Sequence, residues 1–138
     1  AERGQGAWLN GATIQPSLAT DLNQCLLVTG FPYDIRTSPE KNLDNYARFS
    51  MLSQGVRRLG SSALDLCYVA SGRLDGYWEM KLHSWDLAAG GLIAEQAGAL
   101  VTKADGDADI LTPPYSILTA NRDIHPLMLN VLFESANA

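Results

Sequence analysis

One carboxylate stands out for its neighbours. Asp86 lies between Trp85 and four consecutive small residues, Ala88–Gly91, in the stretch SWDLAAGG. Two glycines inside a helix cost about 1 kcal/mol each relative to alanine, so we expect this turn to let a ligand or another element approach its backbone. One interpretation makes Asp86 a helix-start charge, with Ser84 or Asp86 itself as the cap. The other makes it a ligand of a hard cation beside a phosphate.

Two further places offer groups that could join Asp86. Glu79 precedes it on an expected strand, where its carboxylate would accept hydrogen bonds from a polyhydroxylated ligand or simply face water. Gly60, Ser61 and Ser62 separate two predicted helices. Their backbone N–H groups and hydroxyls suit a ligand-contact loop and suit a plain helix cap equally well.

Other patterns fail as metal sites. The segment 105–109, DGDAD, alternates acids like a calcium loop, but Ile110 stands where the turn glycine is required and Ser116 where the bidentate glutamate is required. We interpret it as a solvated turn. His83 and His125 are isolated, without the spacing of a zinc site.

Tryptophan and cysteine are interpreted as structural residues. Trp8, Trp78 and Trp85 are expected in the core rather than in a stacking platform. Cys25 and Cys67 lie in apolar runs without CxxC spacing, so we expect two buried thiols rather than a disulfide.

Composition narrows the class of protein. The chain has 138 residues, 46% hydrophobic and 18% charged, which fits one globular domain, residues 1–138. A net charge of −5 without a basic run argues against a nucleic-acid or anionic-membrane partner, although a bound cation would still allow a small phosphate ester. No apolar run is long enough to span a membrane, and we expect a cytoplasmic protein.

The pattern of strands and helices predicts a layered α/β fold. Asn10-Gly11 indicates a hairpin, and Asp75-Gly76 indicates a second turn; together they predict a mixed sheet. Asn42 is expected to cap a helix running to Leu59, with Arg57 and Arg58 at its carboxyl end. The remaining expected strands are 23–29, 77–82, 99–103 and 116–120, and the remaining helices are 63–71, 85–98 and 124–133.

The sequence WDLAAG at residues 85–90 resembles the WDxAAG signature of the inositol monophosphatase family. The stretches RRLGSSALDLCYVASGRLDGYWE, GAWLNG, LLVTGFPYD and ILTANRDIH are similar to the family as well, as are EQAG and LVT, so the resemblance covers nearly the whole chain. Ser84 replaces the usual proline before the tryptophan.

The resemblance implies a fold, a chemistry and roles. The fold would be a layered mixed β-sheet with helices, the carboxyl-terminal half of the family's sugar-phosphatase fold. Asp86 would bind a catalytic Mg²⁺ ion and touch the substrate, Glu79 would bind a hydroxyl of the substrate's alcohol, and Gly60, Ser61 and Ser62 would line that pocket. The family hydrolyses small phosphomonoesters. The Glu79 match and the lack of basic residues near it favour inositol phosphate.

The family's amino-terminal metal-binding segment has no counterpart here. The DPxDGT-type signature and its preceding glutamates are missing from the sequence. One carboxylate is a weak Mg²⁺ site, so we expect this chain alone to be inactive. The alternative is a truncated, non-catalytic domain that oligomerises or binds a polyol phosphate. In either case we expect the uncovered apolar face to associate with another copy or with a missing amino-terminal half.

Overall fold

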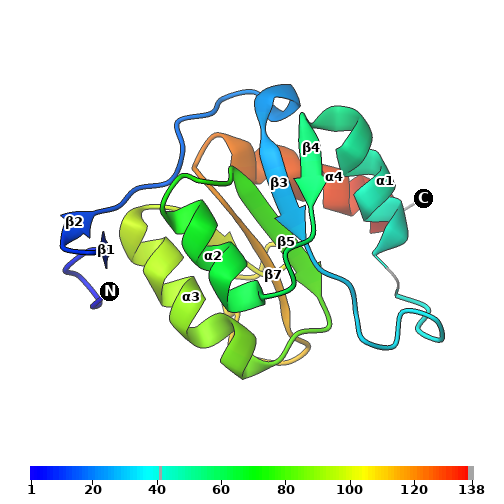
Figure 1. Cartoon of the computed structure of the whole chain (residues 1–138). Coiled ribbons are helices and arrows are strands. Elements are labelled where there is room, and N and C mark those ends of the chain that lie inside the picture. Colours follow the sequence, from blue (N-terminus) through cyan, green and yellow to red (C-terminus); the bar gives the residue numbers. More distant parts are fainter. Residues whose placement is uncertain (41, 137–138) are drawn as a thin grey trace.

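The computed structural model describes residues 1–40 and 42–136. Its main feature is a five-stranded mixed sheet in the order β4-β3-β5-β7-β6 (Figure 1). The strands are β3 (Leu26–Thr29), β4 (Gly55–Arg57), β5 (Gly76–Met80), β6 (Leu100–Thr102) and β7 (Ser116–Ala120), and β1 (Trp8–Leu9) and β2 (Ala12–Thr13) form a separate hairpin. The helices are η1 (Leu22–Gln24), α1 (Leu43–Leu52), α2 (Ser62–Ala70), α3 (Ser84–Ala97) and α4 (Ile124–Ala136).

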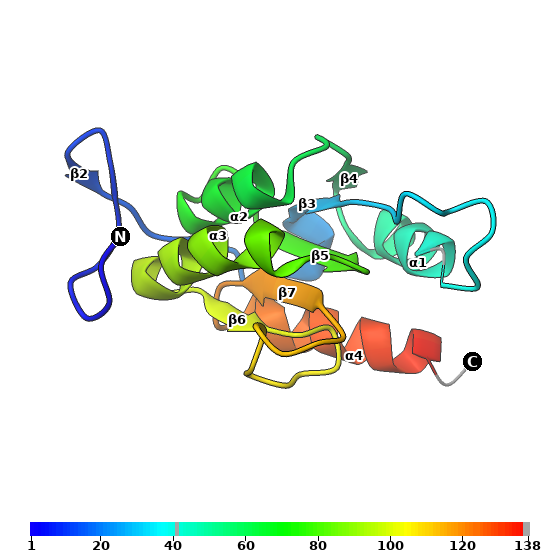
Figure 2. The same cartoon turned by 90° about the horizontal axis from the view of Figure 1, so that it is seen from below.

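Helices cover both faces of the sheet. Figure 2 shows α2 and α3 on one face and α4 on the other. Successive strand residues point to opposite faces, and both faces are apolar here: Leu27, Trp78 and Leu118 pack toward α1 and α4, whereas Val28, Tyr77 and Ile117 pack toward α2 and α3. The continuous apolar runs in the sequence follow from this double burial, and the predicted layered α/β fold is confirmed.

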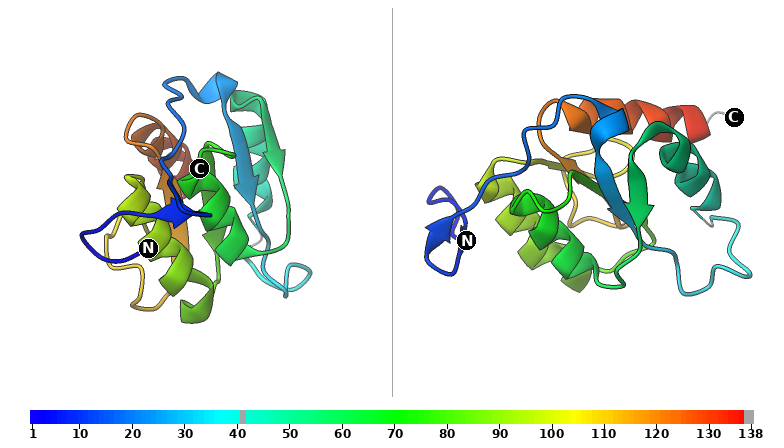
Figure 3. Two further views of the ribbon diagram at one scale, coloured as in Figure 1. Left: turned by 60° about the vertical axis from the view of Figure 1, so that its left-hand side comes forward. Right: turned by 45° about the horizontal axis from the view of Figure 1, so that its top comes forward.

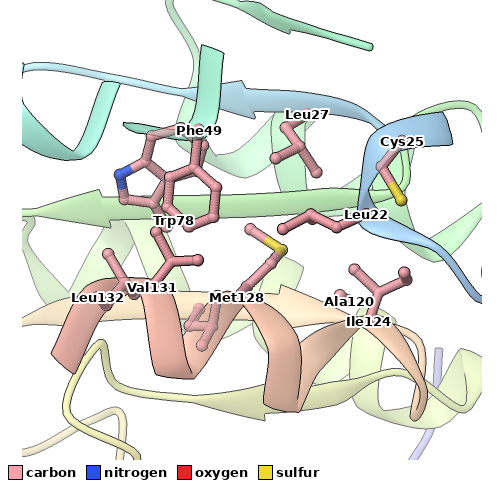
Figure 4. Packing of buried hydrophobic residues seen from close by; sticks show 11 residues of the cluster. Leu22, Cys25, Leu27, Phe49, Trp78, Ala120, Ile124, Met128, Val131 and Leu132 are labelled. Atoms are coloured by element: carbon pink, nitrogen blue, oxygen red, sulfur yellow. The ribbon is translucent and has the colours of Figure 1, made fainter. Parts of the chain in front are cut away.

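The core on the α4 face is built around an aromatic pair. The rings of Phe49 and Trp78 lie 4.1 Å apart, and Met128 and Val131 of α4 pack in the same cluster (Figure 4). Trp78 is buried as predicted, but the prediction is wrong for Trp8 and Trp85, which are 45% and 74% exposed. Both cysteines are free thiols as expected, with Cys25 buried and Cys67 partly buried.

The amino-terminal hairpin forms at the predicted turn. Asn10 and Gly11 adopt left-handed backbone angles, φ 53° and 83°, and join two antiparallel strands. Figure 3 shows the hairpin at the margin of the molecule beside α3. Gly4 N donates to Gln96 Oε1 (2.7 Å) and connects this region to α3.

The helix predicted through Leu59 is wrong in its second half. α1 ends at Leu52, and the edge strand β4 begins three residues later. Gln54 N donates to Cys25 O (3.0 Å), which brings the chain into parallel pairing with β3. Tertiary pairing thus overrides local helix propensity.

The sheet is mixed, but Asp75-Gly76 is not a hairpin turn. Asp75 Oδ2 accepts from Leu26 N (2.7 Å), and Gly76 opens β5, which runs parallel to β3. The antiparallel part of the sheet comes from β7, which pairs antiparallel with β5 and β6. The expectation of a mixed sheet was therefore correct, but the hairpin turn expected at Asp75-Gly76 does not cause it.

The two glycines after Asp86, Gly90 and Gly91, serve packing against other elements. A side-chain carbon at Gly90 would lie 2.7 Å from Leu66 Cβ and 3.2 Å from Ala63 O on α2, and one at Gly91 would lie 2.7 Å from Ile110 Cδ1. Of the two alternatives expected at this turn, the approach of another element is the one found at both glycines, because α2 and the loop before β7 occupy the space.

We expect Gly90→Ala to destabilise the fold, since Leu66 Cβ and a backbone oxygen cannot move aside; overpacking costs about 1–3 kcal/mol, more than the roughly 1 kcal/mol gained in helix propensity. Gly91→Ala meets only the terminal methyl of Ile110 and should be near neutral. Urea unfolding of the two variants checks this, and equal effects would contradict the packing argument.

Candidate functional site

A cavity of about 230 Å³ lies where the ends of β3 and β5 meet the starts of α2 and α3. In open α/β sheets, ligands bind at the carboxyl ends of strands. The cavity brings together all the residues singled out from the sequence, since Gly60, Ser61, Ser62, Glu79 and Asp86 all line it. Their roles in binding and catalysis stay predictions; their convergence is an observation.

Glu79 is a buried acid held by hydrogen bonds. Glu79 is 9% exposed, and its Oε2 accepts from Tyr77 Oη (2.6 Å) and from Ser62 Oγ (3.2 Å). A strand acid facing water is therefore excluded. Burial raises the pKa of Glu79 and the nearby Asp86 carboxylate adds to this, while the two hydrogen bonds and Arg58 oppose it.

Gly30 is a site residue that the sequence analysis missed. It follows β3 directly, and any side chain there would collide with the carboxylate of Glu79. The absence of a side chain lets the acid lie against the backbone at the end of the neighbouring strand. A glycine at the end of a buried strand is the available sequence signal.

Asp86 fulfils the helix-start interpretation, and its role as a cation ligand stays a prediction. It is the third residue of α3, and its Oδ2 accepts from His83 N (2.9 Å), which satisfies a free N–H at the helix start. The N-cap residue is His83, so the expectation that Ser84 or Asp86 is the cap is wrong. The Asp86 side chain is 30% exposed and lines the cavity, where it remains available to a ligand.

The two serines of the Gly60–Ser62 loop have different partners. Ser61 is the N-cap of α2, and its Oγ accepts from Leu64 N (3.5 Å). Ser62 begins the helix and donates instead to Glu79. The cap alternative is thus correct for Ser61, and Ser62 contacts the buried acid.

Asp65 is a second buried acid in the cavity wall, and it was not anticipated. It is 1% exposed, and its Oδ1 has no hydrogen-bond partner. Burial, together with the charge of Glu79, raises the pKa of Asp65 to about 7. Its position one helical turn after Ser62 places the two on the same side of α2, a signal that could have identified it once Ser62 was singled out.

Basic side chains also border the cavity. Arg58 and Lys81 both line it, so the expectation that no basic residues lie near Glu79 is wrong. The Arg58 guanidinium lies 5.1 Å from the centre of the Phe31 ring. Lys81 Nζ lies 2.8 Å from Asp34 Oδ2 in the loop after β3.

Metal-binding chemistry is incomplete in this part of the fold. Within residues 1–40 and 42–136, no three His, Cys, Asp or Glu side chains gather in a way that could hold a metal ion. The acids of the 105–109 segment bind their own loop: Asp105 Oδ1 accepts from Asp107 N (3.0 Å), and Asp107 Oδ1 accepts from Asp109 N (2.9 Å). The interpretation of that segment as a turn is confirmed.

A larger, open groove of about 1110 Å³ lies beside the cavity. Its walls come from the start of α1, the end of β5, the 104–116 loop and the end of α4, and they include Leu43, Asp44, Tyr115 and Leu132. The groove and the cavity share Lys81, Leu82 and His83 as lining residues.

In the described part of the chain, no helix is both long and apolar enough to span a membrane.

The chain matches the inositol monophosphatase family over residues 1–136, and it therefore belongs to that family. It is 41% identical over 129 residues to "Phosphatase IMPL1, chloroplastic" of Arabidopsis thaliana, covering 94% of this chain and 34% of that protein. It is 46% identical over 121 residues to an inositol-1-monophosphatase of Synechocystis, covering 87% of this chain and 42% of that protein.

Solved structures give the same result. An inositol monophosphatase from Anabaena superposes with a TM-score of 0.91 at 42% identity, covering 96% of this chain and 52% of that one. The chain thus spans between about a third and a half of the length of these relatives.

The raised pKa of Asp65 gives a test of the buried acid. Between about 4 and about 7 the folded state keeps a proton that the unfolded state has lost, so stability falls as pH rises through that window. Asp65→Asn removes this loss of stability. Relative to wild type, its free energy of unfolding should rise by on the order of 2–4 kcal/mol between pH 4 and pH 8.

Urea unfolding at both pH values measures the gain, with Asp123→Asn as the control because Asp123 is exposed and lies outside the cavity. A difference between Asp65→Asn and wild type that stays constant with pH would contradict the assignment.

Proposed function

We propose that this chain supplies the alcohol-binding side, and one metal-binding carboxylate, of an Mg²⁺-dependent phosphomonoesterase that acts on inositol phosphate or a similar small polyol phosphate. The observation that carries the proposal is the convergence of Glu79 and Asp86 on one small cavity at the carboxyl ends of parallel strands. Relatives described as an inositol-1-monophosphatase and a phosphatase support the reaction class.

Glu79 is suited to bind the alcohol part of the substrate. Tyr77 and Ser62 direct their hydrogen bonds to its Oε2, which fixes the carboxylate and leaves its other oxygen for a ligand hydroxyl. The cavity is smaller than the roughly 300–1,000 Å³ of drug-sized pockets, which suits a single polyol ring rather than a nucleotide. Gly30 keeps the acid close to the backbone and so shapes the floor of this pocket.

Asp86 has the chemistry of an Mg²⁺ ligand, but one carboxylate does not complete an Mg²⁺ site. A hard cation prefers carboxylate oxygens and needs several of them, and the described residues provide no such group. We therefore assign Asp86 as one ligand and propose that the other ligands come from polypeptide beyond these residues. On this proposal the chain alone does not turn over substrate.

Asp86→Asn tests the metal assignment. A chimera in which this chain replaces the matching segment of the Synechocystis relative should hydrolyse inositol 1-phosphate with Mg²⁺, and the isolated chain should not. Asn keeps an oxygen that can accept from His83 N, so the fold should persist, while turnover should fall by about a hundredfold or more with the loss of the charged ligand.

Asp123→Asn in the same chimera is the matched control and should keep its activity, because Asp123 lies in neither the cavity nor the groove. Full turnover by the Asp86→Asn chimera would remove Asp86 from the mechanism.

We further propose that the isolated chain associates through the groove beside the cavity. Leu43 borders that groove and is 50% exposed, and apolar surface of this kind promotes association. Light scattering should give a mass of at least twice 14.9 kDa, and Leu43→Glu should lower it. Met51→Glu, on the same helix but outside the groove, should not. A 14.9 kDa species for the wild type would contradict this association.

A further inference from the structure

The two buried acids of the cavity have unequal surroundings. Glu79 receives hydrogen bonds from Tyr77 and Ser62, whereas the Oδ1 of Asp65 is buried without any donor. An ionised carboxylate buried without partners is very costly, and such a group keeps its proton instead. Where two neighbouring acids differ in this way, their protonation states separate, with the poorly solvated acid neutral and the hydrogen-bonded one charged.

The charge of Glu79 acts in the same direction. Glu79 of β5 is the ionisable group whose charge raises the pKa of Asp65, in addition to burial, and Tyr77 of the same strand is an uncharged phenol whose own pKa is raised by burial. The other charged or titratable residues that line the cavity are Tyr33, Arg58, Lys81, His83 and Asp86.

The position of Asp65 at a helix start does not explain why an acid is buried there. Asp65 lies in the first turn of α2, where an exposed carboxylate would be stabilised by the helix dipole. This acid is instead almost fully buried in a cavity wall, where a smaller apolar residue would avoid an unpaired oxygen. An acid with an unpaired oxygen in a cavity wall is therefore placed to contact a ligand.

We propose that Asp65 and Glu79 form a donor–acceptor pair that recognises two adjacent hydroxyls of a polyol, with neutral Asp65 donating and charged Glu79 accepting. A hydroxyl both donates and accepts, so a vicinal diol can give each acid a hydroxyl of its own, one accepting from Asp65 and one donating to Glu79. Two charged acids would only accept and would repel each other. The inference rests on the alcohol-binding role proposed for Glu79 and adds Asp65 as a residue that determines specificity.

NMR on the 138-residue chain tests the pair without metal or phosphate, and hence independently of catalysis. At about pH 6, below the pKa of about 7, the ¹³C carboxyl signal of Asp65 should be that of a protonated acid. Titration with myo-inositol should give saturable shifts of the Asp65 and Glu79 signals, and cyclohexanol should bind at least about tenfold more weakly. An ionised Asp65 at this pH, or no binding of myo-inositol, would overturn the proposal.

Two variants separate hydrogen bonding from packing. Asp65→Asn keeps a neutral donor and should bind myo-inositol within about threefold of wild type, whereas the similarly sized, apolar Asp65→Leu should lose about tenfold or more. Equal binding by both would overturn the proposal. If the leucine variant does not fold, the direct carboxyl signal and the cyclohexanol comparison still decide the question. A chimera that hydrolyses substrate while these tests fail would refute the pair and leave the phosphatase proposal intact.

Discussion

A buried carboxylate that must find donors organises this end of the molecule. Glu79 lies inside the fold, where an unpaired charge would cost far more than one hydrogen bond returns. Its donors come from β5 itself, through Tyr77 two residues earlier, and from the first residue of α2, through Ser62. Gly30 provides the space beside it. The position of β3 against β5 and the entry of α2 over the sheet are thus constrained by one side chain.

The opposite face of the same strands is held by an amide. Asn42 Nδ2 donates to Thr29 Oγ1 (2.9 Å) and to Gly30 O (2.8 Å), and Asn42 Oδ1 accepts from Trp78 Nε1 (2.8 Å). Asn42 is the N-cap residue of α1, as expected, but its side chain makes no cap hydrogen bond and its backbone is left-handed, φ 61°. It instead closes the loop that follows β3, so that the loop's Phe31 and Ile35 remain beside the cavity.

The parts of the structure that could be predicted are those that leave a local signal. The Asn10-Gly11 hairpin has its turn chemistry, and β7 was predicted with its observed bounds because it is a short apolar strand between polar segments. β4 left no such signal, since three residues cannot show a period and their pairing with β3 depends on a distant part of the chain. The packing role of Gly90 and the burial of Asp65 were not predicted for a related reason. The neighbours of both residues come from elements far along the sequence.

The segment Lys81–His83 connects the cavity with the groove. All three of its residues line both the cavity and the groove. Lys81 has a left-handed backbone, φ 56°, and is restrained through its side chain by Asp34 and Ser38. A protein surface seated in the groove and a small molecule in the cavity would therefore press on the same wall. An occupant of the groove that shifted this wall would change the cavity, and an occupant of the cavity that shifted it would change the groove to the same extent, because such coupling is reciprocal.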